Sequence, residues 1–223
     1  MFRFSILLAL MLGIVMIAPT AKADEVLSDL PASPDASARY LFYMHGGYVE
    51  KRGGGADYHY ADILDALAAK GLVVIGEERG QIGNPMNYVP KVVGQVTALL
   101  DGGVPAENIT VAGHSKGGLI SLVTASRLGN ASIKFGIMAA CGQEASKFGR
   151  PYNKFIKRGA SRIKGRFLAA WAKDDDVAGN CDRALDKAGV PYENKILPAG
   201  KGHRLFYTPD PLWIDLLAAY AKG

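Results

Sequence analysis

A short turn between a strand and a helix is the feature that most restricts how this chain can fold. The apolar segment Asn108–Ala112 reads as a β-strand, runs directly into Gly-His-Ser-Lys-Gly at 113–117, and is followed by a helical segment at 119–127. In so sharp a turn, side chains at the glycines would collide with the neighbouring strand and helix. The hydroxyl of Ser115 would stand clear of the backbone near a helix N-terminus, where negative charge is favoured. The context predicts a nucleophilic serine, and the alternative is a Gly-rich turn whose serine caps the helix.

The rest of the chain alternates apolar runs with amphipathic segments. Most apolar runs are continuous, as expected for parallel strands that are buried on both faces. The alternation predicts an α/β fold with a single doubly wound, mainly parallel sheet and helices on both faces. The expected strands are 38–44, 72–77, 109–112, 135–140, 167–172 and 194–197, and the expected helices are 58–70, 86–100, 115–128, 182–188 and 211–221.

The first 23 residues have the pattern of a secretory signal peptide. Arg3 precedes an apolar run, Phe4–Ala18, and the segment ends in Ala21-Lys-Ala23. An uncleaved membrane anchor is the alternative, but the run is short for a bilayer span. We expect cleavage after Ala23, one domain over 24–223, a periplasmic or secreted location, and no stable membrane insertion of the mature protein.

The base that would activate Ser115 can be sought by elimination, because the chain has four histidines. His114 lies inside the turn and is expected to point away from the serine. His45 is expected to shape the loop after the first strand, and His59 is expected to be exposed at the start of a helix. His203, in a Gly-rich loop after the last expected strand, is therefore the candidate base.

A carboxylate should orient this histidine, and the candidates follow the strand 167–172. Asp175 is preferred, because the apolar Val177 two residues later would fix the loop and turn Asp175 inward. Asp174 would then cap a turn and Asp176 would be a solvated neighbour. Both remain alternatives if the register of the loop is shifted.

Backbone N–H groups are expected to stabilise an oxyanion beside the serine. One donor should be the N–H of Lys116, the residue after the candidate nucleophile. The other should come from the loop at 45–48, with Gly47 preferred and Tyr48 as the alternate, because glycines let the backbone approach a substrate oxygen.

Together these residues resemble the α/β-hydrolase superfamily, and the chain order Ser115, Asp175, His203 is the order of that superfamily. The resemblance extends over essentially all of 24–223 and implies acyl transfer to water through an acyl-enzyme, without a cofactor. There are two departures. Residues 24–37 are too short for the usual first two strands, so we expect a sheet of about six strands. The region that would form a cap, 143–166, is short, which argues against a lipase with a large apolar lid.

The predicted function is hydrolysis of a small or medium ester. A peptidase or amidase using the same triad is one alternative, and a binding protein that has lost the chemistry is another. The histidines show no ligand spacing such as His-x₃-His, so we expect no metal. Without the two basic residues of the leader, the net charge is about +3, too small to indicate a nucleic-acid partner. The oligomeric state is not predicted.

Two further features have functional interpretations. The segment 143–166 holds eight basic residues and one acidic residue. It is interpreted either as a solvated surface or as a short cap that attracts an anionic substrate or surface. Cys141 and Cys181 are expected to form a disulfide at the carboxyl edge of the sheet, and two free thiols are the alternative.

Overall fold

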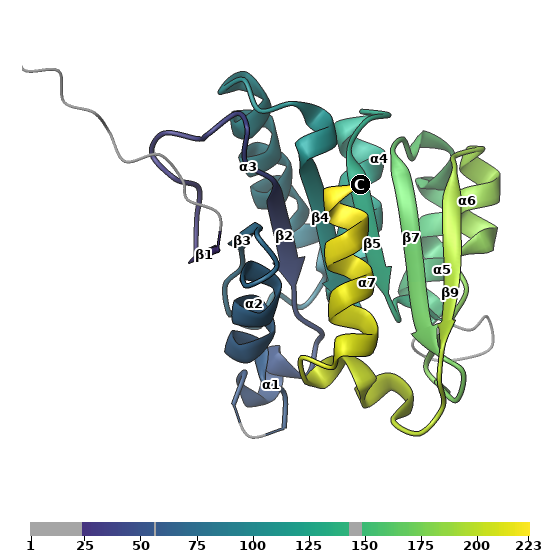
Figure 1. The fold of residues 1–223 in the computed structure, drawn as a ribbon. Coiled ribbons are helices and arrows are strands. Elements are labelled where there is room, and N and C mark those ends of the chain that lie inside the picture. The colour runs from purple at the N-terminus through teal and green to yellow at the C-terminus, as the bar shows by residue number, and fades with distance from the viewer. Residues whose placement is uncertain (1–23, 56, 143–148) are drawn as a thin grey trace, which may run out of the picture.

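A seven-stranded sheet forms the centre of the protein in the computed structural model, which describes residues 24–55, 57–142 and 149–223. Its order is β1-β3-β2-β4-β5-β7-β9, and all of its neighbouring strands are parallel (Figure 1). The six expected strands are present, which confirms the α/β fold class. The strands are Glu25–Leu27 (β1), Tyr40–Met44 (β2), Val73–Ile75 (β3), Ile109–His114 (β4), Lys134–Met138 (β5), Arg166–Ala172 (β7) and Tyr192–Leu197 (β9). The expected leader, 1–23, lies outside the described residues.

The sheet has one strand more than expected. β1 is only three residues long and pairs with β3 at the edge, where Glu25 lies opposite Val73. Three residues give too little side-chain pattern for the strand to be recognised. A second, two-stranded antiparallel sheet joins Cys141–Gly142 (β6) to Ala178–Gly179 (β8), and it was also not expected.

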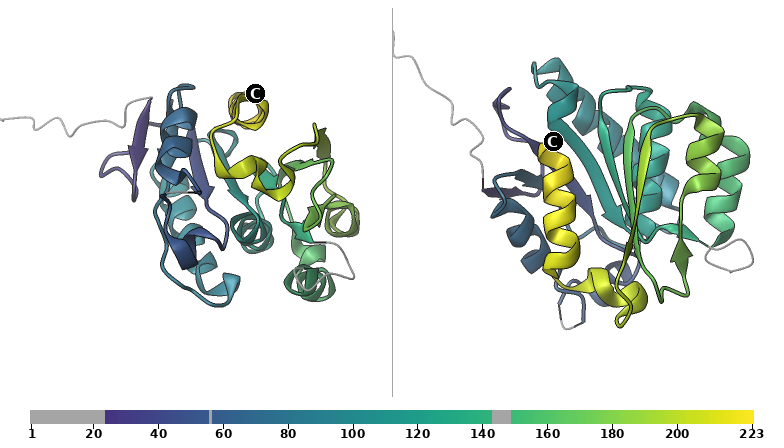
Figure 2. Two further views of the ribbon diagram at one scale, coloured as in Figure 1. Left: turned by 90° about the horizontal axis from the view of Figure 1, so that it is seen from below. Right: turned by 45° about the vertical axis from the view of Figure 1, so that its right-hand side comes forward.

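Helices cover both faces of the sheet, as predicted. α2 and α7 pack on one face, and α3, α4, α5 and α6 on the other (Figures 1 and 2). The helices are Val49–Arg52 (α1), Tyr60–Ala68 (α2), Val89–Asp101 (α3), Lys116–Leu128 (α4), Gly149–Arg158 (α5), Asp182–Ala188 (α6) and Pro211–Lys222 (α7). Short 3₁₀ helices span Pro85–Asn87 (η1), Ala106–Asn108 (η2), Ala160–Arg162 (η3) and Gly202–Tyr207 (η4). Within the described ranges, no helix is long and apolar enough to cross a membrane.

The basic segment contributes a packed helix to this layer. Residues 143–148 lie outside the described residues, and α5 follows them. Tyr152, Phe155 and Ile156 of α5 are buried in the same hydrophobic cluster as α4 and α6. The segment therefore presents one apolar face to the core, and its basic residues lie mostly on the other face.

The carboxyl ends of the central strands meet at one edge, which is the lower edge in Figure 1. Met44, at the end of β2, lies opposite Gly113, and His114, at the end of β4, lies opposite Met138. Parallel pairing in this register brings the loops after neighbouring strands together. The predicted site residues all follow strand ends at this edge.

The expected disulfide is present. Cys141 and Cys181 are joined, with their Cα atoms 5.2 Å apart. The bond links the segment after β5 to the segment after β7, and both cysteines are buried. It therefore ties together two of the loops at the carboxyl edge.

Candidate active site

Ser115 lies in a strained turn between β4 and α4. Its φ of 54° and ψ of −114° place a non-glycine residue in a region that L-amino acids rarely adopt. Its N–H donates to the carbonyl of Met138 at 2.8 Å, and a Cβ on Gly117 would lie 2.1 Å from the carbonyl oxygen of Met44. The turn is thus held by the neighbouring strands and requires the small residue that the sequence analysis expected. Ser115 is half-buried and is the residue immediately before α4.

Asp175 and His203 contact each other at the same edge of the sheet. The distance from Asp175 Oδ2 to His203 Nδ1 is 2.9 Å, and their side chains are 0% and 13% exposed. The other carboxylate oxygen accepts the N–H groups of Val177 at 2.8 Å and Ala178 at 2.9 Å. A carboxylate can only accept, so Nδ1 of His203 carries the proton in this pair and Nε2 keeps its lone pair. This arrangement gives the histidine the tautomer of a general base.

Asp174 holds the loop that carries His203. Its carboxylate accepts the N–H of Gly200 at 2.8 Å and of Gly202 at 3.2 Å. The hydrogen bond from Gly200 is the main reason that the pKa of Asp174 lies below its usual value. Asp176, the third carboxylate of the run, is exposed. Asp174 therefore contacts the backbone of the loop that carries His203, whereas Asp175 contacts the His203 side chain.

The loop at 45–48 passes directly against the serine turn. A Cβ on Gly46 would lie 2.9 Å from Nδ1 of His114 and 3.4 Å from Cβ of Ser115, so the approach requires glycine. A Cβ on Gly47 would be in ordinary contact with Lys116, 3.6 Å from its Cδ. Since Lys116 is the first residue of α4, its N–H has no acceptor within its own helix. The expected oxyanion donors therefore lie on two adjoining segments beside Ser115.

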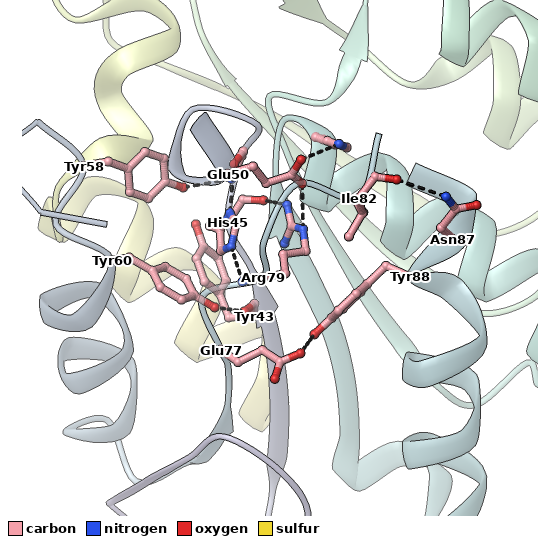
Figure 3. Close-up of polar contacts among 12 residues, drawn as sticks. Tyr43, His45, Glu50, Tyr58, Tyr60, Glu77, Arg79, Ile82, Asn87 and Tyr88 are labelled. Carbon is pink, nitrogen blue, oxygen red and sulfur yellow. Dashed lines mark hydrogen bonds and ion pairs between the residues drawn. The ribbon is translucent and has the colours of Figure 1, made fainter. Parts of the chain in front are cut away.

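A buried ion-pair network joins these two segments. Glu50, in α1, contacts Arg79 Nε at 3.0 Å with Oε1 and Lys116 Nζ at 2.5 Å with Oε2. The Glu50 and Arg79 side chains are 5% and 2% exposed. The N–H of Arg79 donates to Nε2 of His45 at 2.9 Å, and its guanidinium donates to the His45 carbonyl (Figure 3). One carboxylate thus connects the residue after the serine to the loop at 45–48.

His45 is a fixed part of this loop, as the sequence analysis expected. Its Nδ1 donates to the carbonyl of Gly46 at 2.8 Å, and its Nε2 accepts from Arg79. Burial, with a further contribution from the Arg79 charge, lowers the pKa of His45 to about 3. The ring is therefore neutral at physiological pH, as its accepting role requires.

His114 packs against His203. The centroids of the two rings are 4.6 Å apart, and the His114 ring stacks on Phe206 at 5.3 Å. Its Nδ1 lies 3.2 Å from the hydroxyl of Tyr58. Complete burial holds the pKa of His114 well below its usual value. This neutral ring supports the candidate base, a contact that the sequence analysis did not anticipate.

Some residues of the site gave no signal in the sequence. Glu50 and Lys116 are 66 positions apart, and no motif links Arg79 to either. His59 is exposed and pairs with Asp62 on α2, as expected for a residue outside the site. In the parts of the chain that the structure describes, no three His, Cys, Asp or Glu residues gather as a possible metal site.

Comparison with known proteins gives matches among solved structures. No protein-family model and no curated protein sequence matches the chain. A hyperthermophilic esterase from the archaeon Pyrobaculum calidifontis is 18% identical, with a TM-score of 0.60 over 83% of this chain and 76% of that one. SOBER1 of Arabidopsis thaliana is 14% identical, with a TM-score of 0.55 over 83% and 98%.

A puromycin-hydrolysing peptidase from Mycobacterium tuberculosis is 16% identical, with a TM-score of 0.57 over 82% of this chain and 34% of that one. At these identities the likeness concerns the fold, and it extends to both an esterase and a peptidase.

Proposed function

Because the chain has the α/β-hydrolase fold, we propose that it is a serine hydrolase whose triad is Ser115, His203 and Asp175. The observation that carries this proposal is the hydrogen bond between Asp175 and His203, at the sheet edge where Ser115 occupies its strained turn. Buried backbone contacts fix Asp175, and Asp174 fixes the loop of His203. A binding protein without the chemistry would not need this arrangement.

The proposed reaction begins with attack of Ser115 Oγ on the substrate carbonyl. His203 Nε2 takes the hydroxyl proton, and Asp175 stabilises the imidazolium through Nδ1–H. The N–H groups of Lys116 and of Gly47, with Tyr48 as the alternate, receive the oxyanion. The proton passes to the leaving group, an acyl-enzyme remains, and water activated by His203 releases the acid. Glu50 and Arg79 act as positioning residues that hold the two donor segments together.

The proposed substrate is a small or medium ester. The structural likeness to an esterase supports this choice, and the likeness to a peptidase supports amide hydrolysis as the second candidate. Leaving-group preference depends on the pocket rather than on the fold. That the preferred ester carries a negative charge remains a prediction. Its kcat/KM should fall with salt more steeply than that of a neutral ester if the protein's positive field steers it.

Labelling with a fluorophosphonate probe tests the nucleophile. We expect the probe to modify Ser115, and Ser115→Ala to abolish both labelling and hydrolysis. Ser132→Ala, at an exposed position, is the matched control. Comparing p-nitrophenyl esters of graded length with peptide anilides then separates esterase from amidase. Full hydrolysis by Ser115→Ala would refute the proposed triad.

We also propose that the protein is exported. The disulfide supports this location, because such bonds form and persist in oxidising compartments. N-terminal sequencing of protein recovered from the periplasm or medium should begin at Asp24. Recovery only from the cytoplasm, with Met1 retained, would contradict the proposal.

A further inference from the structure

A groove separate from the triad opens on the helical layer that holds α3 to α6. It has a volume of about 320 Å³ and is bounded by η1, α4, α5 and η3. Its lining includes the apolar side chains of Met86, Val123 and Phe155. Val123 and Phe155 are buried, so the floor is continuous with the hydrophobic core. We call this hollow the α5 groove.

The charged residues that line the α5 groove are all basic within the described parts of the chain. They are Arg127 from α4, Lys154 and Arg158 from α5, and Arg162 from η3. A second hollow of about 330 Å³ adjoins it and shares Lys154 and Arg158. Among the residues that the structure describes, no aspartate or glutamate lines either hollow. Each therefore has a positively charged lining.

These cations have no counterions among the described residues. The ion pairs found there do not include Arg127, Lys154 or Arg158. Arg162 donates one hydrogen bond to the carbonyl of Arg158, at 2.9 Å, which fixes its guanidinium at the end of α5. The sequence from 149 to 166 contains seven basic residues and no acidic residue. Like charges gathered around one hollow repel each other, and an anion between them would remove that repulsion.

The α5 groove is remote from the proposed nucleophile. Val123 and Arg127 lie 8 and 12 positions after Ser115 along the same helix, which corresponds to about 12–18 Å along the axis. None of Ser115, Asp175 and His203 lines the groove. A ligand bound there would not occupy the triad, so this inference does not rest on the proposed function.

We propose that the α5 groove binds a small amphiphilic anion, with a carboxylate or phosphate head group on an apolar chain. The head group meets the guanidinium groups of Arg127 and Arg158, which match planar or tetrahedral oxyanions. The apolar chain covers Met86 and Phe155. The volume lies within the range of small-molecule sites, about 300–1,000 Å³. A hydrophilic polyanion would leave the apolar floor uncovered, and a flat membrane surface would not fill a hollow.

Fluorescence titration with a dansyl-labelled fatty acid tests the proposal. The full chain is first treated with a fluorophosphonate, so that binding near Ser115 is blocked if that serine reacts. We expect saturable binding, a rise in Kd with salt, and displacement by dodecyl phosphate and dodecanoate but not by uncharged dodecyl maltoside. Arg127→Ala combined with Arg158→Ala should raise Kd at least about tenfold, because hydrogen bonds to charged groups are lost.

Lys222→Ala is the control, since Lys222 is an exposed cation at the end of α7, on the other face of the sheet. Thermal melts of each variant verify folding. The double variant should hydrolyse a neutral ester as the parent does, if the parent is active. Absence of saturable binding by the parent would overturn the proposal, as would an equal loss in Lys222→Ala. Binding to anionic vesicles without binding of the free amphiphiles would show a membrane-docking surface instead.

Discussion

Asp174 and Asp175 are adjacent carboxylates that follow β7, yet their contacts suit them to different roles. Asp175 is buried and contacts the imidazole of His203, whereas Asp174 is exposed and accepts two backbone N–H groups of the loop that carries this histidine. The first contact can stabilise charge on the ring during reaction. The second can only position the loop, so the two substitutions should have different kinetic signatures.

We expect Asp175→Asn to lower kcat by about 10⁴, because an amide can stabilise the wrong tautomer of His203. Asp174→Ala should lower kcat by about tenfold through loss of loop positioning. Asp176→Ala, at an exposed position, is the matched control and should have little effect. Steady-state kinetics on one ester measures all three. If Asp176→Ala were the most damaging change, the assignment of the acid would be wrong.

Glu50 should matter for both stability and turnover. Glu50→Gln leaves the buried Arg79 and the partly buried Lys116 without their carboxylate, and breaking a buried pair such as Glu50–Arg79 costs about 3–5 kcal/mol. We also expect kcat to fall more than KM rises, since the donor segments lose their shared anchor. Urea denaturation and kinetics on the folded protein give the two values. Glu193→Gln, which breaks an exposed pair with Lys195, should cost only about 0–1 kcal/mol. Equal stability of the two variants would contradict the role given to Glu50.

At the scale of elements, the sequence predicts the long apolar strands and five of the helices, but it misses the short α1, the amphipathic α5 and the short strands that pair with distant segments. β2 and β4 are continuous apolar runs, and such runs predict strands that are buried on both faces of the sheet. β1 depends on backbone pairing with β3, and the β6–β8 pair joins residues that are distant in sequence. Such pairings arise from tertiary contacts, and a local pattern does not contain them.

The disulfide should stabilise the elements that carry Asp175. Closing a loop of 40 residues lowers the conformational entropy of the unfolded chain. On the chain-entropy model this stabilises the folded state by about 3–4 kcal/mol. Reduction should therefore lower the Tm, and it should lower kcat as well, because the segment after β7 loses its link to the segment after β5. Calorimetry and kinetics with and without reductant measure both effects. Cys141→Ser with Cys181→Ser should reproduce them and be insensitive to reductant. An unchanged Tm after complete reduction would exclude this role.

At the scale of the whole molecule, the site could be predicted in part. The order Ser115, Asp175, His203 follows from motifs at strand ends, and the parallel sheet brings those ends to one edge. The ion pairs of Glu50 and the packing of His114 against His203 depend on side-chain positions across loops that share no sequence pattern. Sequence analysis therefore yields candidate reacting groups more readily than the groups that would hold them in place.

Two buried, neutral histidines should make the stability of the whole fold sensitive to mild acid. Burial holds the pKa of His45 at about 3 and that of His114 well below its usual value, whereas both return to about 6.5 in the unfolded chain. Between these values the unfolded state binds more protons than the folded state, so the free energy of unfolding falls as the pH is lowered below about 6.5. Between its folded and unfolded pKa, each histidine contributes at most about 1.4 kcal/mol per pH unit.

Urea denaturation at pH 7 and pH 5, above the range where most carboxylates titrate, should therefore show a marked loss of stability at pH 5. His114→Phe removes one titrating group and keeps an aromatic ring against Phe206, so its stability should depend less steeply on pH in this window. His59→Phe is the control: His59 is exposed on α2 and pairs with Asp62, and its replacement should leave the steep dependence in place. A parent protein equally stable at pH 5 and pH 7 would mean that these histidines are not held neutral in the fold.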